Sequence, residues 1–128
     1  MINPAEFKLL MRPIVAEHYP NELFAFDVSS DELMQKLKLD GHIETAARKE
    51  SRINFMEQAM AVLGFLGVLI STYKAVVEIR SLQLKNKIDR QTIEKSWLEL
   101  LREHGLTNEM AQKIVSKHLE EFNEYLNR

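Results

Sequence analysis

The four histidines are the side chains of this sequence best suited to bind a metal ion or to transfer a proton. They are His18, His42, His104 and His118, and they are widely separated along the chain. Only His118 has a carboxylate at helical spacing, Glu121 three residues later, a spacing that helical metal sites use. A metal site of that type requires a second such pair, which the sequence lacks. We therefore expect no metal site.

Other catalytic patterns are missing as well. The chain has no cysteine, which excludes disulfides, thiolate nucleophiles and zinc–thiolate sites. No serine stands in a glycine-bracketed turn, and no glycine-rich loop is present to hold a phosphate. His104 and His118 are expected on the buried faces of neighbouring helices, where a contact between them would belong to the core. The sequence thus predicts a protein that is not an enzyme, with no cofactor and no small-molecule substrate.

The composition predicts a single all-α domain. The chain has 128 residues, of which 45% are hydrophobic and 28% charged, enough for one buried core over residues 1–128. Only four glycines and three prolines are present, which favours four to five helices over many short strands. The N-terminus has no basic segment followed by an apolar run, so no signal peptide is predicted and we expect a cytoplasmic protein.

The net charge of −2 makes nucleic acid an unfavourable partner. Phosphate neutralisation needs a dense stripe of lysine and arginine, and no segment carries one. The predicted C-terminal hairpin has a glycine at its turn, as DNA-binding helix-turn-helix motifs often do. The exposed face of its second helix is almost balanced in sign, so a structural hairpin is favoured.

A long apolar segment organises the rest of the chain. Residues 59–73 contain no charge, and Glu57 and Lys74 bracket them. The pattern around this segment predicts one long central helix over residues 44–88, or two helices joined by a bend. Between residues 59 and 70 this helix is apolar on every side, and a few short helices rarely cover such a surface. Gly67, Ser71 and Ala75 stand four residues apart and favour the close approach of another helix, from the same chain or from a partner.

An N-terminal helical segment is predicted over residues 1–41. Asn3 can cap the first helix, whose first position is Pro4. Pro13 should end or bend this helix. Residues 21–28 are expected to form a loop with apolar anchors, and Ser29 to cap a second helix that ends near residues 40–41.

A helical hairpin is predicted over residues 89–128. Asp89, or Lys87 and Ile88 just before it, marks its beginning. The two helices are separated by a C-terminal cap at Gly105 and an N-terminal cap at Thr107.

The leading functional prediction is a non-enzymatic interaction, assembly or adaptor subunit. It would bury part of residues 53–79 against a protein partner, in a homo-oligomer or a hetero-oligomer, because large exposed apolar surfaces mark interfaces. Large aromatic and aliphatic side chains should anchor that interface, with small residues beside them. The predicted interface residues are Phe55, Leu63, Gly64, Phe65, Leu66, Gly67, Leu69, Ile70, Ser71, Tyr73 and Trp97.

A membrane-associated protein is the alternative. It would be anchored or would oligomerise through residues 59–77, with the C-terminal hairpin in the cytosol. The uncharged segment 59–73 has fifteen residues, and a bilayer needs about 20. A run of this length is more often a buried helix, so the soluble prediction is preferred.

Overall fold

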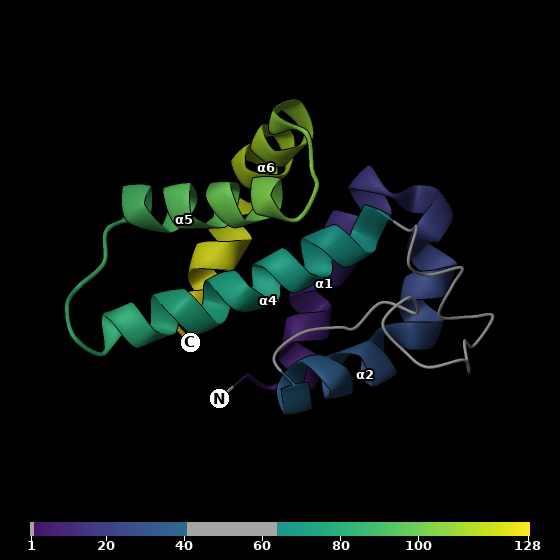
Figure 1. The fold of residues 1–128 in the computed structure, drawn as a ribbon, viewed down its shortest axis with the longest axis horizontal. Helices are drawn as coiled ribbons and strands as arrows, with labels where there is room; N and C mark the ends of the chain where they lie inside the picture. The colour runs from purple at the N-terminus through teal and green to yellow at the C-terminus, as the bar shows by residue number, and fades with distance from the viewer. Residues whose placement is uncertain (1, 41–63) are drawn as a thin grey trace.

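The computed structural model describes residues 2–40 and 64–128, and these are almost entirely helical (Figure 1). They contain five α-helices and one short 3-10 helix, with no strand, so the predicted all-α fold is confirmed for this part of the chain. The elements are α1 Pro4–His18, η1 Pro20–Glu22, α2 Leu23–Asp40, α4 Gly64–Gln83, α5 Arg90–Glu103 and α6 Asn108–Leu126.

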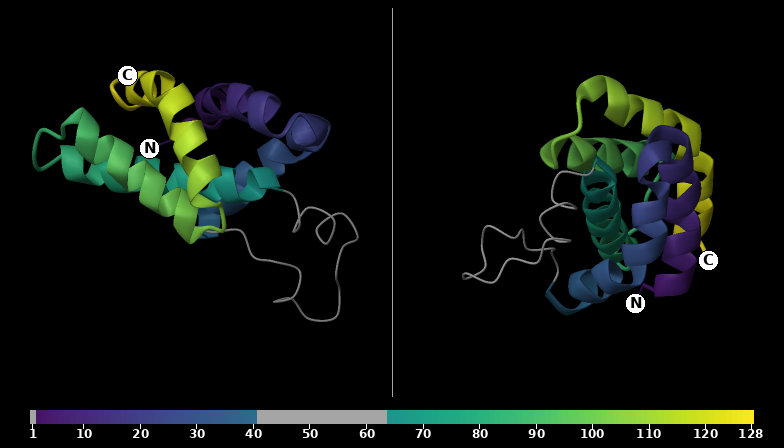
Figure 2. Two further views of the ribbon diagram at one scale, coloured as in Figure 1. Left: turned by 90° about the horizontal axis from the view of Figure 1, so that it is seen from above. Right: turned by 90° about the vertical axis from the view of Figure 1, so that its right-hand side faces the viewer.

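Helix α4 is the central element of this fold. It lies beside α5, which runs back along it, while α6 crosses behind the pair and lies next to α1 (Figures 1 and 2). Helix α2 packs on α1 and touches α4. Buried apolar side chains from all five helices form one continuous cluster.

The N-terminal caps predicted at Asn3 and Thr107 are present, and Asp89 caps α5. Asn3 Oδ1 accepts hydrogen bonds from the backbone N–H groups of Ala5 and Glu6, and Asp89 accepts one from Thr92. Thr107 caps α6 through Met110 N. These bonds satisfy backbone donors that a helix leaves unpaired at its N-terminus.

Gly105 closes α5 with φ of +98°, a backbone conformation that favours glycine. The N–H of Leu106 then donates to the carbonyl of Leu101 at 3.2 Å, as expected at a glycine C-cap. The predicted C-terminal hairpin, α5 and α6, is therefore confirmed.

The structure differs from two expectations for the N-terminal segment: Pro13 does not end α1, and residues 21–28 are not a loop. Helix α1 continues through Pro13 to His18, because Leu10, Met11, Ile14 and Val15 around it are all buried and this packing outweighs the lost backbone bond.

Residues 21–28 form the end of η1 and the start of α2 rather than a loop, and Ser29 lies inside α2 instead of capping it. Its hydroxyl instead donates to the carbonyl of Ala25 at 2.6 Å, a bond to the preceding turn that a serine inside a helix can make.

The predicted long helix over residues 44–88 lies partly outside the described residues. Its described part, α4, ends at Gln83, earlier than the sequence pattern predicts. A turn follows, in which Lys85 and Asn86 both donate to the carbonyl of Leu82, and the chain then reaches the Asp89 cap. Residues 84–87 are exposed and contribute nothing to the core, so no packing energy extends the helix.

Candidate functional site

Four of the predicted interface residues lie in the core of the single chain. Phe65, Leu69, Ser71 and Trp97 are almost completely buried. Phe65 meets Phe26 of α2 edge to face, with ring centres 5.7 Å apart. In this structure the chain's own helices cover these side chains, so they present no surface to a partner.

The space beside each of the two predicted interface glycines is also occupied by residues of the same chain. A Cβ at Gly64 would clash with the ring of Tyr19, and one at Gly67 would lie 2.9 Å from the carbonyl oxygen of His104 and 3.1 Å from Leu106. The close approach that the small residues suggested therefore occurs with Tyr19, between α1 and η1, and with the α5–α6 turn. Phe55 and Leu63 lie outside the described residues.

The remaining predicted interface residues, Leu66, Ile70 and Tyr73, are half-buried. They share one side of α4 with Val77, which is 50% exposed, and with Leu84 just beyond the helix, which is 89% exposed. We call these five residues the α4 flank. Along the helix they recur every three or four residues with a single polar position, Arg80, which is the spacing of a helix-pairing seam.

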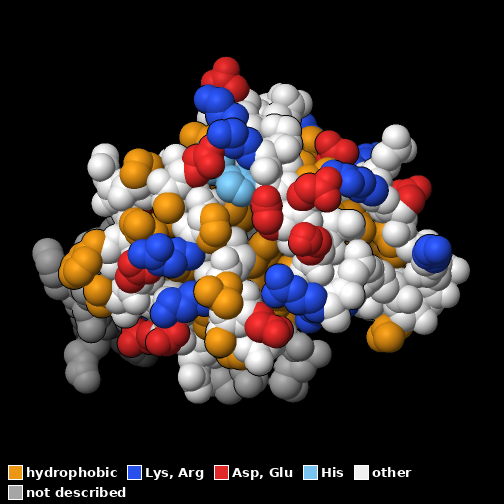
Figure 3. Space-filling view, turned by 180° about the vertical axis from the view of Figure 1, so that it is seen from behind, with side chains coloured by type: hydrophobic (Ala, Val, Ile, Leu, Met, Phe, Trp, Pro, Cys, Tyr) orange, Lys and Arg blue, Asp and Glu red, His pale blue; other side chains and the backbone are white. Residues whose placement is uncertain are grey.

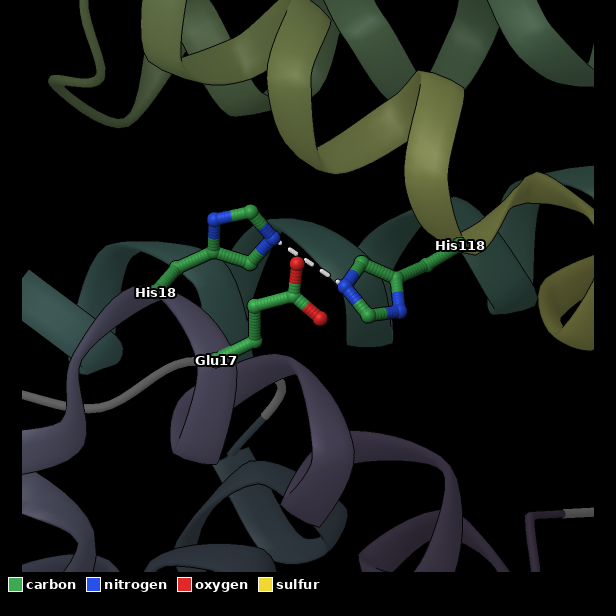
Figure 4. A group of neighbouring side chains, drawn as sticks. All are labelled: Glu17, His18 and His118. Atoms are coloured by element: carbon green, nitrogen blue, oxygen red, sulfur yellow. Dashed lines mark hydrogen bonds between the residues drawn. The ribbon is translucent and has the colours of Figure 1, made fainter.

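A second cluster joins α1 to α6. The Nε2 atoms of His18 and His118 lie 3.1 Å apart, and the two rings meet edge to face (Figure 4). His118 is only 6% exposed, whereas His18 is half-buried. His118 thus meets His18 rather than His104, whose Nε2 lies 3.4 Å from Lys74 Nζ. His42 lies outside the described residues.

Carboxylates stand on both sides of the histidine pair. Glu17 places its carboxylate beside the two rings, and its oxygen and the two imidazole nitrogens all lie within 4.8 Å of one another (Figure 4). The same carboxylate accepts a hydrogen bond from Lys117. On the other side, Glu121 Oε1 lies 3.8 Å from His118 Nδ1. Among the described residues, Glu17, His18 and His118 are the group able to hold a metal ion.

Burial lowers the pKa of both imidazoles below the ordinary value of 6.5. For His18 the second cause is the positive charge of a protonated His118, whereas the nearby Glu121 opposes the shift at His118. Lys117 lowers the pKa of Glu17, chiefly through their hydrogen bond. At neutral pH the cluster therefore combines two neutral imidazoles with an ionised carboxylate.

The histidine pair predicts that stability falls on mild acidification. Because the pKa values of both imidazoles are lower in the folded chain, the unfolded chain binds protons first, and the loss runs from about pH 6.5 down to the lowered values. Urea unfolding with a chelator, repeated across this range, measures it. His118→Gln should flatten the dependence, and stability that rises on acidification through this window would contradict the assignment.

Figure 3 shows apolar atoms on the rear face in small groups between charged side chains, with a histidine reaching the surface.

Within the described residues, no helix combines the length and apolar character needed to cross a membrane. Residues 59–63 of the alternative anchor fall outside this part of the chain.

Comparison with protein-family models, with curated proteins and with solved structures found no match.

Local sequence patterns identified only part of the histidine cluster. The spacing of His118 and Glu121 was visible, because both lie on α6. Glu17 and His18 come from α1, a hundred residues earlier, and no spacing rule relates positions so distant. One sequence pattern did point to His18. It lies three and four residues after the buried Val15 and Ile14, on the same face of α1, and this implies a neighbour across the core.

Proposed function

We propose that this chain is a non-enzymatic helical assembly subunit, and that its α4 flank binds the α4 flank of a second copy. The observation that carries the proposal is the flank itself. Leu66, Ile70 and Tyr73 pack partly against the chain's own core, but together with the exposed Val77 and Leu84 they leave an apolar seam open to solvent. Apolar residues at this spacing are typical of paired helices.

A second copy fits this seam because the seam is compatible with a two-fold axis. If two α4 helices pair in opposite directions about Ala75, Leu66 lies opposite Leu84 of the other copy, and Tyr73 lies opposite Val77. Each contact then occurs twice, as in the interface of an isologous dimer. The most exposed side chain of the flank, Leu84, would thus be covered by a half-buried one.

Arg80 is the polar position of the seam and already has a partner within the chain. Its guanidinium carbon lies 5.0 Å from the ring centre of Tyr125, and its Nη2 donates to the Tyr125 carbonyl at 3.4 Å. The charge is held against α6, so pairing of the flank does not require an unpartnered arginine to be buried.

Light scattering of the untagged chain across a concentration series tests the proposal. We expect a mass of twice 14.9 kDa at the upper concentrations. A monomer over the whole series would contradict self-association.

Two matched valine substitutions locate the interface. Val77→Glu should return the mass to that of one chain, because a carboxylate buried in an apolar contact has no partner. Val28→Glu makes the same change on α2 at a similar exposure of 55%, and it should leave the mass unchanged. Equal effects of both substitutions would place the interface elsewhere.

A further inference from the structure

We propose that Glu17, His18 and His118 form a binding site for one divalent transition-metal ion of the zinc type, which links α1 to α6. The inference is independent of the α4 flank, so either proposal can fail without the other.

The donor geometry is close to that of a zinc site. Two imidazole nitrogens on one tetrahedral zinc, with bonds of 2.0–2.1 Å, lie about 3.3 Å apart. The Nε2 atoms of His18 and His118 lie 3.1 Å apart, and the Glu17 oxygen is within 4.8 Å of both. A small outward movement of the rings, together with an inward movement of the Glu17 carboxylate, would place the three donors around one ion.

The surroundings of the buried histidine suit the metal-bound form. With an ion on Nε2, His118 carries its proton on Nδ1, and Glu121 Oε1 lies 3.8 Å from that atom. A carboxylate that accepts the second ring N–H is the usual support of a metal-ligating histidine, and a small movement of Glu121 would bring it within hydrogen-bond distance. Burial also keeps both imidazoles neutral, the form that binds metal.

The Glu17 carboxylate can reach the ion at little cost. Its present partner, Lys117, forms an exposed ion pair with it on the surface, and such pairs contribute little to stability. Release of Lys117, or use of the second carboxylate oxygen, leaves one oxygen for the metal. The positive charge of Lys117 nevertheless opposes the binding of a cation here. Removal of this charge should therefore strengthen metal binding, whereas removal of a ligand should weaken it.

The donor set selects the type of ion. Two imidazole nitrogens and one carboxylate oxygen favour Zn²⁺, Co²⁺, Ni²⁺ and Cu²⁺, whereas Mg²⁺ and Ca²⁺ prefer oxygen donors alone. Glu17 is exposed, so water reaches the remaining coordination position, as in zinc sites with three protein ligands.

A cobalt titration of the metal-free, untagged full-length chain tests the site. Tetrahedral Co²⁺ bound by nitrogen and oxygen absorbs visible light, so binding is followed directly. We expect one Co²⁺ per chain, displaced by Zn²⁺ but not by Mg²⁺, and a higher unfolding temperature with Zn²⁺ because the ion binds the folded chain.

Substitutions distinguish this site from binding elsewhere. His18→Gln should abolish the cobalt signal, and Glu17→Gln should weaken binding about tenfold or more. Lys117→Gln should strengthen binding, since it removes the competing positive charge. His104→Gln is the matched control, because that imidazole contacts Lys74 instead, and it should leave binding unchanged.

The proposal fails if the wild-type chain binds neither Co²⁺ nor Zn²⁺, or if binding survives both His18→Gln and Glu17→Gln. Both residues are at least partly exposed, so these variants are expected to fold, and circular dichroism checks this. His118→Gln is a further ligand variant, and its interpretation depends on the same check because His118 is buried.

Discussion

Replacement of Trp97 by alanine should lower the free energy of unfolding by about 3–5 kcal/mol. The indole is completely buried, stacks on Phe122 with ring centres 4.2 Å apart, and donates from Nε1 to Thr72 Oγ1 at 2.9 Å. The substitution leaves a cavity between α4, α5 and α6 and removes this hydrogen bond. A loss of this size is a large share of the stability of a domain, typically about 5–15 kcal/mol.

Urea unfolding followed by circular dichroism measures the effect of Trp97→Ala. Thr72→Val is the companion variant: it keeps the packing but leaves the buried indole N–H unpaired, which should cost about 1–3 kcal/mol. Trp97 was predicted from the sequence to contact a partner. Trp97→Ala could instead change the mass in solution while the unfolding free energy stayed within about 1 kcal/mol of wild type. That result would support the partner contact predicted from the sequence and contradict a place for Trp97 in the core.

Replacement of Gly67 by alanine should destabilise the chain, although alanine is normally more favourable than glycine inside a helix. Helix propensity alone favours the substitution by about 1 kcal/mol. The added Cβ would lie 2.9 Å from the carbonyl oxygen of His104, a backbone atom that cannot rotate away. Overpacking of this kind costs about 1–3 kcal/mol, so we expect a net loss.

Ser81→Ala is the control for Gly67→Ala, since Ser81 lies in the same helix but is exposed. It should be neutral or slightly stabilising in the same urea experiment. A stabilising Gly67→Ala would mean that the α5–α6 turn does not press against α4 at this point, and it would contradict the packing described above.

Features set by neighbouring residues were predicted well. The caps at Asn3 and Thr107, and the C-cap at Gly105, each depend on atoms within a few residues, so the sequence pattern was sufficient there. The helical hairpin followed from them. The all-α fold followed from composition and helical periodicity.

Features set by tertiary packing were predicted poorly. Pro13 stays inside α1 because buried neighbours hold the helix, and no local rule measures that contribution. The sequence marked Phe65, Leu69 and Trp97 as apolar, but an apolar side chain does not reveal whether its own chain or another covers it. The meeting of His18 with His118 depends on how α1 and α6 cross, which local spacing does not specify.

Cross-linking through a single introduced cysteine tests the assembly proposal most directly. The natural chain has no cysteine, so Val77→Cys carries the only thiol, and Val28→Cys provides a control of similar exposure on α2. A short bismaleimide should join two copies of the Val77→Cys chain efficiently and leave the Val28→Cys chain monomeric. Equal cross-linking of the two variants, or none in either, would contradict pairing of the α4 flanks.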